Sequence, residues 1–219
     1  MGLYRCGMKK SDGVVFNRTK ICDNSNLSST LTFTEDYHNY PLVCITIYNN
    51  STGLNTSIVT TPDIIDAIFT YSNNTINFNE FGNNQYCNYN KVNNTSWERY
   101  HQRNCDVISI YGITCNKSIT HHTLYNKEGY TASTEVSINT VESLFDYDFI
   151  FFSVCDGDSS ETQPCINYAI MPGRDEFSPD KTLIPYVYNR YDNYYELNIK
   201  EHNIEGSKYY FCVQAIKIN

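Results

Sequence analysis

Short runs of β-branched and aromatic residues recur along the whole chain and are separated by turns rich in Asn, Gly and Ser. The 219 residues include 20 Tyr, whereas charged residues make up only 18%. Such side chains favour strands joined by turns, while long helices prefer Ala, Leu, Glu and Lys. The predicted strands are residues 31–34, 42–48, 74–78, 134–138, 148–154, 166–171, 184–188, 194–199 and 209–218. Residues 148–154 are apolar on both faces, which indicates a central, buried strand.

Two segments instead have the pattern of short helices. Thr61 offers an N-cap hydroxyl, and Pro62 follows it at the first helical position. Thr95 begins a capping box with Glu98, and Trp97 is expected to pin this second helix to a sheet. There is no linker rich in Pro, Ser or Gly. The sequence therefore predicts an all-β fold, a disulfide-braced two-sheet β-sandwich with one or two short helical insertions, as a single domain over residues 1–219.

Nine cysteines are spread along the chain without a C-x-x-C pair, a distribution typical of disulfides rather than of zinc sites. They are Cys6, Cys22, Cys44, Cys87, Cys105, Cys115, Cys155, Cys165 and Cys212. The odd number leaves one of them unpaired, and the spacing does not reveal the pairing. We expect a secreted protein that passes through the secretory pathway. Because the chain opens without a signal peptide, we interpret it as a mature fragment, and it has no apolar run that could span a membrane.

The glycosylation signals and the negative charge lie in different parts of the sequence. Asn-x-Ser/Thr sequons occur at Asn17, Asn26, Asn49, Asn50, Asn55, Asn73, Asn93, Asn94 and Asn116. The candidate glycosylation sites among them are Asn17, Asn26, Asn50, Asn55, Asn73, Asn94 and Asn116. The formal net charge of −8 comes from residues 128–173, which contain no Lys, Arg or His. This separation favours a sugar-free acidic surface that is open to a basic partner.

Within and after the acidic stretch lie the candidate partner-binding residues. They are Glu142, Asp146, Asp148, Asp156, Asp158, Glu161, Tyr186, Tyr188 and Tyr191. The carboxylates would steer a basic protein, and exposed tyrosines would supply contact area. The alternatives are solvated loop charge and the ordinary alternation of side chains on a sheet. The acidic balance disfavours nucleic acid and anionic membranes as partners.

No sequence motif supports catalysis or a cofactor. The chain lacks G-x-S-x-G, G-x-G-x-x-G, H-E-x-x-H and the phosphate-binding loop, so we expect it not to be an enzyme. His121 and His122 would point to opposite faces of a strand and make a poor joint metal site. The oxygen-rich loop at residues 156–161 lacks the full spacing of a calcium site. We therefore expect no metal and no cofactor.

Residues 93–115 carry the most specific pattern in the chain. A Thr-capped segment runs into Cys105, then into alternating Val and Ile, and ends at Cys115. This pattern resembles the poxvirus immune-evasion β-sandwich family, with Thr95 at the cap position and Val107 at the first inward position. The family has a shorter spacing between its two cysteines, and a bulge near Gly112 would absorb the additional residues.

The resemblance implies a secreted viral immunomodulator. Such a decoy binds a host immune protein, most often a chemokine or another cytokine, and blocks its receptor. A second branch of the family binds class I histocompatibility molecules, so a host cell-surface immune receptor is an alternative partner. A further alternative of a different class is a receptor- or glycan-binding attachment domain of a viral surface glycoprotein.

Overall fold

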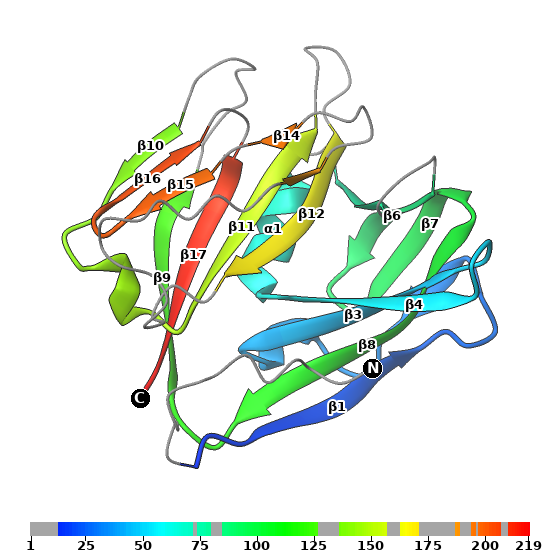
Figure 1. Ribbon diagram of the computed structural model, residues 1–219. Coiled ribbons are helices and arrows are strands. Elements are labelled where there is room, and N and C mark those ends of the chain that lie inside the picture. The colour runs from blue at the N-terminus through cyan, green and yellow to red at the C-terminus, as the bar shows by residue number, and fades with distance from the viewer. Residues whose placement is uncertain are drawn as a thin grey trace.

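The protein is described here by a computed structural model, which places residues 13–71, 74–79, 85–126, 136–156, 163–170, 187–188, 194–195, 197–206 and 210–219. These residues form an all-β fold (Figure 1). The first sheet has four antiparallel strands in the order β1-β8-β3-β4. Their bounds are β1 (Phe16–Asp23), β8 (Cys105–Cys115), β3 (Leu42–Asn49) and β4 (Leu54–Thr60).

The second sheet has eight strands in the order β2-β7-β6-β5-β12-β11-β17-β9. Their bounds are β2 (Thr30–Thr32), β7 (Ser96–Arg103), β6 (Tyr86–Asn93), β5 (Thr75–Asn79), β12 (Gln163–Ile170), β11 (Phe149–Asp156), β17 (Tyr210–Ile218) and β9 (Ile119–Asn126). The two halves of this sheet are each antiparallel, and a single parallel pairing of Cys165 with Asn77 joins them. The prediction of a central strand at 148–154 is confirmed, because β11 lies between β12 and β17.

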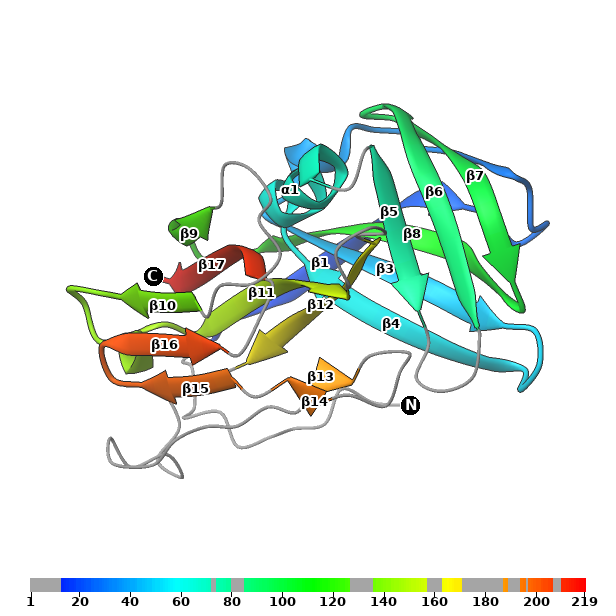
Figure 2. The same ribbon diagram turned by 90° about the horizontal axis from the view of Figure 1, so that it is seen from above.

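Smaller elements complete the described fold (Figure 2). One sheet contains β10 (Val136–Asn139), β16 (Asn203–Gly206) and β15 (Leu197–Lys200), and another pairs β13 (Val187–Tyr188) with β14 (Tyr194–Tyr195). Two 3₁₀ turns, η1 (Tyr37–Asn39) and η2 (Leu144–Asp146), accompany one helix, α1 (Pro62–Tyr71). The first predicted helix is confirmed, and the Ile64 amide donates to the Thr61 hydroxyl at 3.3 Å, as an N-cap requires. Helix α1 packs against β5 of one half-sheet and against β11 and β17 of the other.

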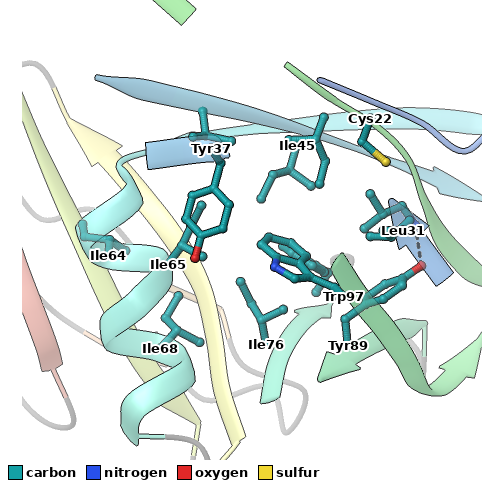
Figure 3. Packing of buried hydrophobic residues seen from close by; sticks show 14 of the residues in the cluster. Cys22, Leu31, Tyr37, Ile45, Ile64, Ile65, Ile68, Ile76, Tyr89 and Trp97 are labelled. Carbon is teal, nitrogen blue, oxygen red and sulfur yellow. Dashed lines mark hydrogen bonds between the residues drawn. The ribbon is translucent and has the colours of Figure 1, made fainter. Parts of the chain in front are cut away.

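An aromatic cluster around Trp97 fills the core between the sheets (Figure 3). The Trp97 ring is fully buried and meets Phe33, Tyr37 and Phe69 edge-on, with ring centroids 5.0, 5.7 and 5.2 Å apart. These rings come from the β2–η1 segment, from α1 and from β7, so one side chain ties three parts of the chain together. Edge-to-face pairs of this kind each contribute roughly 0.5–1.5 kcal/mol beyond their buried area.

The second predicted helix is wrong, because residues 96–103 form strand β7. Asn94 and Thr95 instead make the two-residue turn between β6 and β7, and the Thr95 amide donates to the side chain of Asn93 at 2.8 Å. Trp97 does pin its segment to the core, as expected, but it does so from a strand that pairs with β2 and β6. Local capping signals were overridden by strand pairing and burial.

The predicted bulge in the cysteine-bounded strand is also misplaced. The register of β8 against β3 shifts between Val107 and Ser109, so the additional residue is Ile108 rather than one near Gly112. Gly112 has a different role, because a Cβ atom there would lie 2.3 Å from the Tyr40 ring. The absent side chain is what allows this ring to pack directly onto β8.

The disulfides predicted from the sequence are not present among the six cysteines whose side chains the structure describes. Cys22, Cys44, Cys87, Cys105, Cys115 and Cys212 are thiols. The side chains of Cys6, Cys155 and Cys165 lie outside the described part. The expectation of a disulfide-braced fold therefore stays a prediction.

Candidate functional site: an acidic surface patch

Three of the acidic residues that the sequence singled out, Glu142, Asp146 and Asp148, lie in the loop between β10 and β11, residues 140–148. This loop is held against the β15–β16 turn by two backbone hydrogen bonds. The Leu144 amide donates to the Glu201 carbonyl at 2.7 Å, and the Thr140 amide donates to the His202 carbonyl at 2.9 Å. Two segments far apart in sequence thus form one surface.

The turn η2 determines which side chains of the loop face solvent. The Ser143 hydroxyl caps it by accepting from the Phe145 amide at 3.3 Å. Leu144 and Tyr147 point inward and are buried, whereas Val141 is 99% exposed. An aliphatic side chain this exposed is available for contact with a partner.

Four exposed carboxylates lie on the same loop and on the turn that adjoins it. Glu142, Asp146 and Asp148 of the loop are exposed, and so is Glu201 of the adjoining turn. We call Val141, Glu142, Asp146, Asp148 and Glu201 the acidic patch. Within the described residues, no Lys or Arg forms an ion pair with any of the four carboxylates, since Lys200 pairs with Glu205 at 3.1 Å. His202 Nε2 lies 3.8 Å from the Glu201 carboxylate and would compensate its charge when protonated, whereas Glu142, Asp146 and Asp148 form no ion pair among the described residues.

Hydrogen bonds fix two of these carboxylates in place. Asp148 Oδ2 accepts from the Ile218 amide at 2.6 Å, which ties the end of the loop to β17. Glu142 Oε2 accepts from the Tyr147 hydroxyl at 3.1 Å. Burial and this bond to Glu142 raise the pKa of Tyr147, so its hydroxyl stays protonated and keeps donating. Asp146 and Glu201 have no such backbone or tyrosine anchor, although the Glu201 carboxylate lies 3.8 Å from His202 Nε2.

The remaining predicted site residues are not brought into this patch. Asp156 and Tyr188 lie at the end of β11 and in β13, where only the backbone is described. Asp158, Glu161, Tyr186 and Tyr191 lie outside the described residues. Sequence reasoning missed Val141 and Glu201. Glu201 lies outside the acidic stretch at residues 128–173. It comes close to the loop only because β10 pairs with β16.

Two of the sequons lie at the other end of the fold from the acidic patch. Asn50 and Asn55 are exposed at the turn between β3 and β4, and Figures 1 and 2 show that turn at the far end of the molecule from the loop before β11. Asn17, Asn26, Asn94 and Asn116 are also exposed, whereas Asn49 is 2% exposed. Asn73 lies outside the described residues. Exposure leaves most of the candidate sites open to glycosylation.

A second charged cluster joins η1 to α1 and β6. The His38 ring lies between two carboxylates, with Nδ1 2.6 Å from Asp36 and Nε2 2.7 Å from Asp66. Lys91 Nζ and the Tyr37 hydroxyl also donate to Asp66, at 2.8 and 2.6 Å. Burial lowers the pKa of His38, but the hydrogen bonds to Asp66 and Asp36 outweigh it and raise the pKa overall. The cluster satisfies its own members, which favours a structural role.

A third cluster is buried between the sheets. The Asp106 side chain is 1% exposed and accepts from Arg99 at 2.5 Å and from the Tyr89 hydroxyl at 2.5 Å. A buried carboxylate requires such partners, because an unpaired charge in the core costs several kcal/mol. This cluster also belongs to the scaffold.

The described residues contain no group of three or more His, Cys, Asp or Glu side chains arranged to hold a metal ion. His121 and His122 lie on β9, and His122 packs edge-on against Tyr147 with ring centroids 5.3 Å apart. In the part of the chain that the structure places, no helix has the length and apolar character to cross a membrane. Comparison of the chain with protein-family models, with curated proteins and with solved structures found no match.

Proposed function

We propose that this chain is a secreted viral immunomodulator that uses the acidic patch to bind a basic host immune protein, a chemokine or another cytokine, and so blocks its receptor. The observation that carries the proposal is the exposed Val141 on a loop with three exposed carboxylates, Glu142, Asp146 and Asp148, none of which forms an ion pair among the described residues. Interfaces commonly combine a desolvated apolar contact with charge complementarity at the rim.

The mechanism is steering followed by occlusion. A negative surface raises the association rate of a basic ligand by roughly 10–10³ at low ionic strength. A carboxylate surface that pairs with the basic groups of such a ligand would cover them and prevent the ligand from reaching its receptor. The loss of the predicted helix at Thr95 removes one element of the sequence resemblance, which now depends on β8 and its two cysteines.

Binding of the full chain to a panel of small secreted host proteins tests the proposal. We expect basic members to bind with an affinity that falls as salt rises, and acidic members of similar size not to bind. The variant Asp146→Lys/Glu201→Lys should weaken binding about tenfold, mainly through slower association. Both side chains lack a backbone anchor, so the fold should tolerate the change.

The charge-matched comparison is between the single variants Asp146→Lys and Glu98→Lys, the latter a reversal of an exposed carboxylate on β7, away from the loop. We expect the Glu98→Lys control to bind as the wild type does. If the control and the patch variant lost the same affinity, net charge alone would explain the loss, and a local binding site would be refuted. Binding of neutral partners, or of glycans alone, would instead favour an attachment domain.

A further inference from the structure

Two buried thiols meet where the two sheets approach each other. Cys87 lies in β6 of the eight-stranded sheet, and Cys105 begins β8 of the four-stranded sheet. A parallel β-bridge pairs Tyr86 with Asn104, the residues that directly precede the two cysteines. Both cysteines are completely buried.

This geometry suits a covalent bond between the sheets. A β-bridge holds two backbones about 5 Å apart, and disulfides form between Cα atoms separated by roughly 4.4–6.8 Å. The residues that follow a parallel bridge point to the same side, so the Cys87 and Cys105 side chains lie side by side. Their thiols are close enough for a hydrogen bond between them.

We propose that Cys87 and Cys105 form a disulfide that joins β6 to β8. The bond forms when the two thiols lose two protons and two electrons, and a disulfide oxidant such as oxidised glutathione takes up the electrons and becomes two thiols. The proposal does not depend on which partner the protein binds. The bond would pair two of the nine cysteines and connect the two layers of the fold.

The surroundings of the pair also determine when the bond forms. Burial, the hydrogen bond that the Cys87 thiol donates to Cys105, and the nearby charge of Asp106 raise the pKa of Cys87 well above its ordinary value. The reactive thiolate is therefore scarce in the folded, reduced protein. We expect oxidation to be fast while the chain folds and slow once the reduced chain has folded.

Peptide mapping of the wild-type chain tests the pairing. The full chain is secreted from cells or refolded with reduced and oxidised glutathione, unfolded in acidic denaturant, alkylated and digested without reduction. We expect a peptide pair joined through Cys87 and Cys105 that separates on reduction. A bond from either cysteine to a different partner, or alkylation of both in the oxidised folded protein, would overturn the proposal.

A pair of variants distinguishes a bond from simple packing. Reduction should lower the Tm of the wild type and of Cys44→Ala, whose half-buried thiol lies on β3. In the double variant Cys87→Ala/Cys105→Ala, reduction should lower the Tm by less than in the wild type, because this bond is absent. A double variant that keeps the full shift would show that the two thiols only fill space. The wild-type map remains decisive if a variant fails to fold.

Discussion

Asp106 shows how a single side chain ties the two sheets together. It lies on β8, and its partners Arg99 and Tyr89 lie on β7 and β6 of the facing sheet. Burial, the nearby Cys87 and the hydrogen bond to Asp106 raise the pKa of Tyr89, so this hydroxyl remains a donor at any physiological pH. The polar cluster therefore specifies how the layers are aligned as well as holding them together.

Replacing Asp106 with Asn should destabilise the fold by about 3 kcal/mol, because it leaves the Arg99 charge without its carboxylate. Tyr89→Phe removes one hydrogen bond and keeps the ring, so about 1.5 kcal/mol is expected. Urea denaturation of both variants measures the difference. A buried ion pair would be contradicted if both variants lost the same stability, or if Asp106→Asn left the free energy of unfolding unchanged.

His38 should make stability depend on pH. Its pKa is raised in the folded state from an ordinary value of 6.5, so its contribution is complete below that value and is lost as pH rises through the folded pKa. The free energy of unfolding of the wild type relative to His38→Gln should therefore be largest near pH 6 and shrink towards alkaline pH. A difference that grows with pH would have the wrong sign for this cluster.

At the scale of elements, the passage from β7 to β8 depends on one residue. Asn104 has a φ of 57° and connects a strand of the eight-stranded sheet directly to a strand of the four-stranded sheet. Its carbonyl accepts from the Asn50 amide at 2.8 Å, which also fixes the end of β3. Asparagine tolerates this left-handed conformation, whereas β-branched residues do not.

Asn104→Val should therefore cost about 1–2 kcal/mol of stability through backbone strain. Asn104→Gly adopts the same φ without strain, so it should change stability by only a few tenths of a kcal/mol. Thermal unfolding of the two variants makes the comparison. If the glycine variant were as unstable as the valine variant, the side chain rather than the backbone would be responsible.

Elements whose local and tertiary signals agree were the ones that the sequence predicted correctly. Helix α1 combines an N-cap, a proline at its first position and one apolar face, and β11 begins with four apolar residues, 149–152. The segment from Thr95 failed because its capping box competes with pairing to β2 and β6, which no local pattern encodes. The same limit explains Glu201, which reaches the acidic patch only through the β10–β16 pairing.

At the scale of the whole molecule, the acidic patch is separated in space from the sequons of the β3–β4 turn, but not from the sequon at Asn116. The Ser118 carbonyl of that sequon accepts from the Asn219 amide at 2.9 Å, and the preceding Ile218 amide donates to Asp148 at 2.6 Å. The acidic patch lies at one end of the sandwich, and the sequons of the β3–β4 turn lie at the other end. The sequence predicted this separation, but it overestimated the acidic surface. Phe151 and Phe152 of the acidic stretch are buried in β11, so the stretch is not one continuous surface.

Hydrogen–deuterium exchange of the full chain, with and without a bound basic cytokine, tests the central claim most directly. The acidic patch predicts slower exchange at residues 140–148 and 200–205 in the complex, and little change at the β3–β4 turn. Protection that is confined to the β3–β4 turn or to the exposed face of β7, with residues 140–148 unchanged, would contradict it.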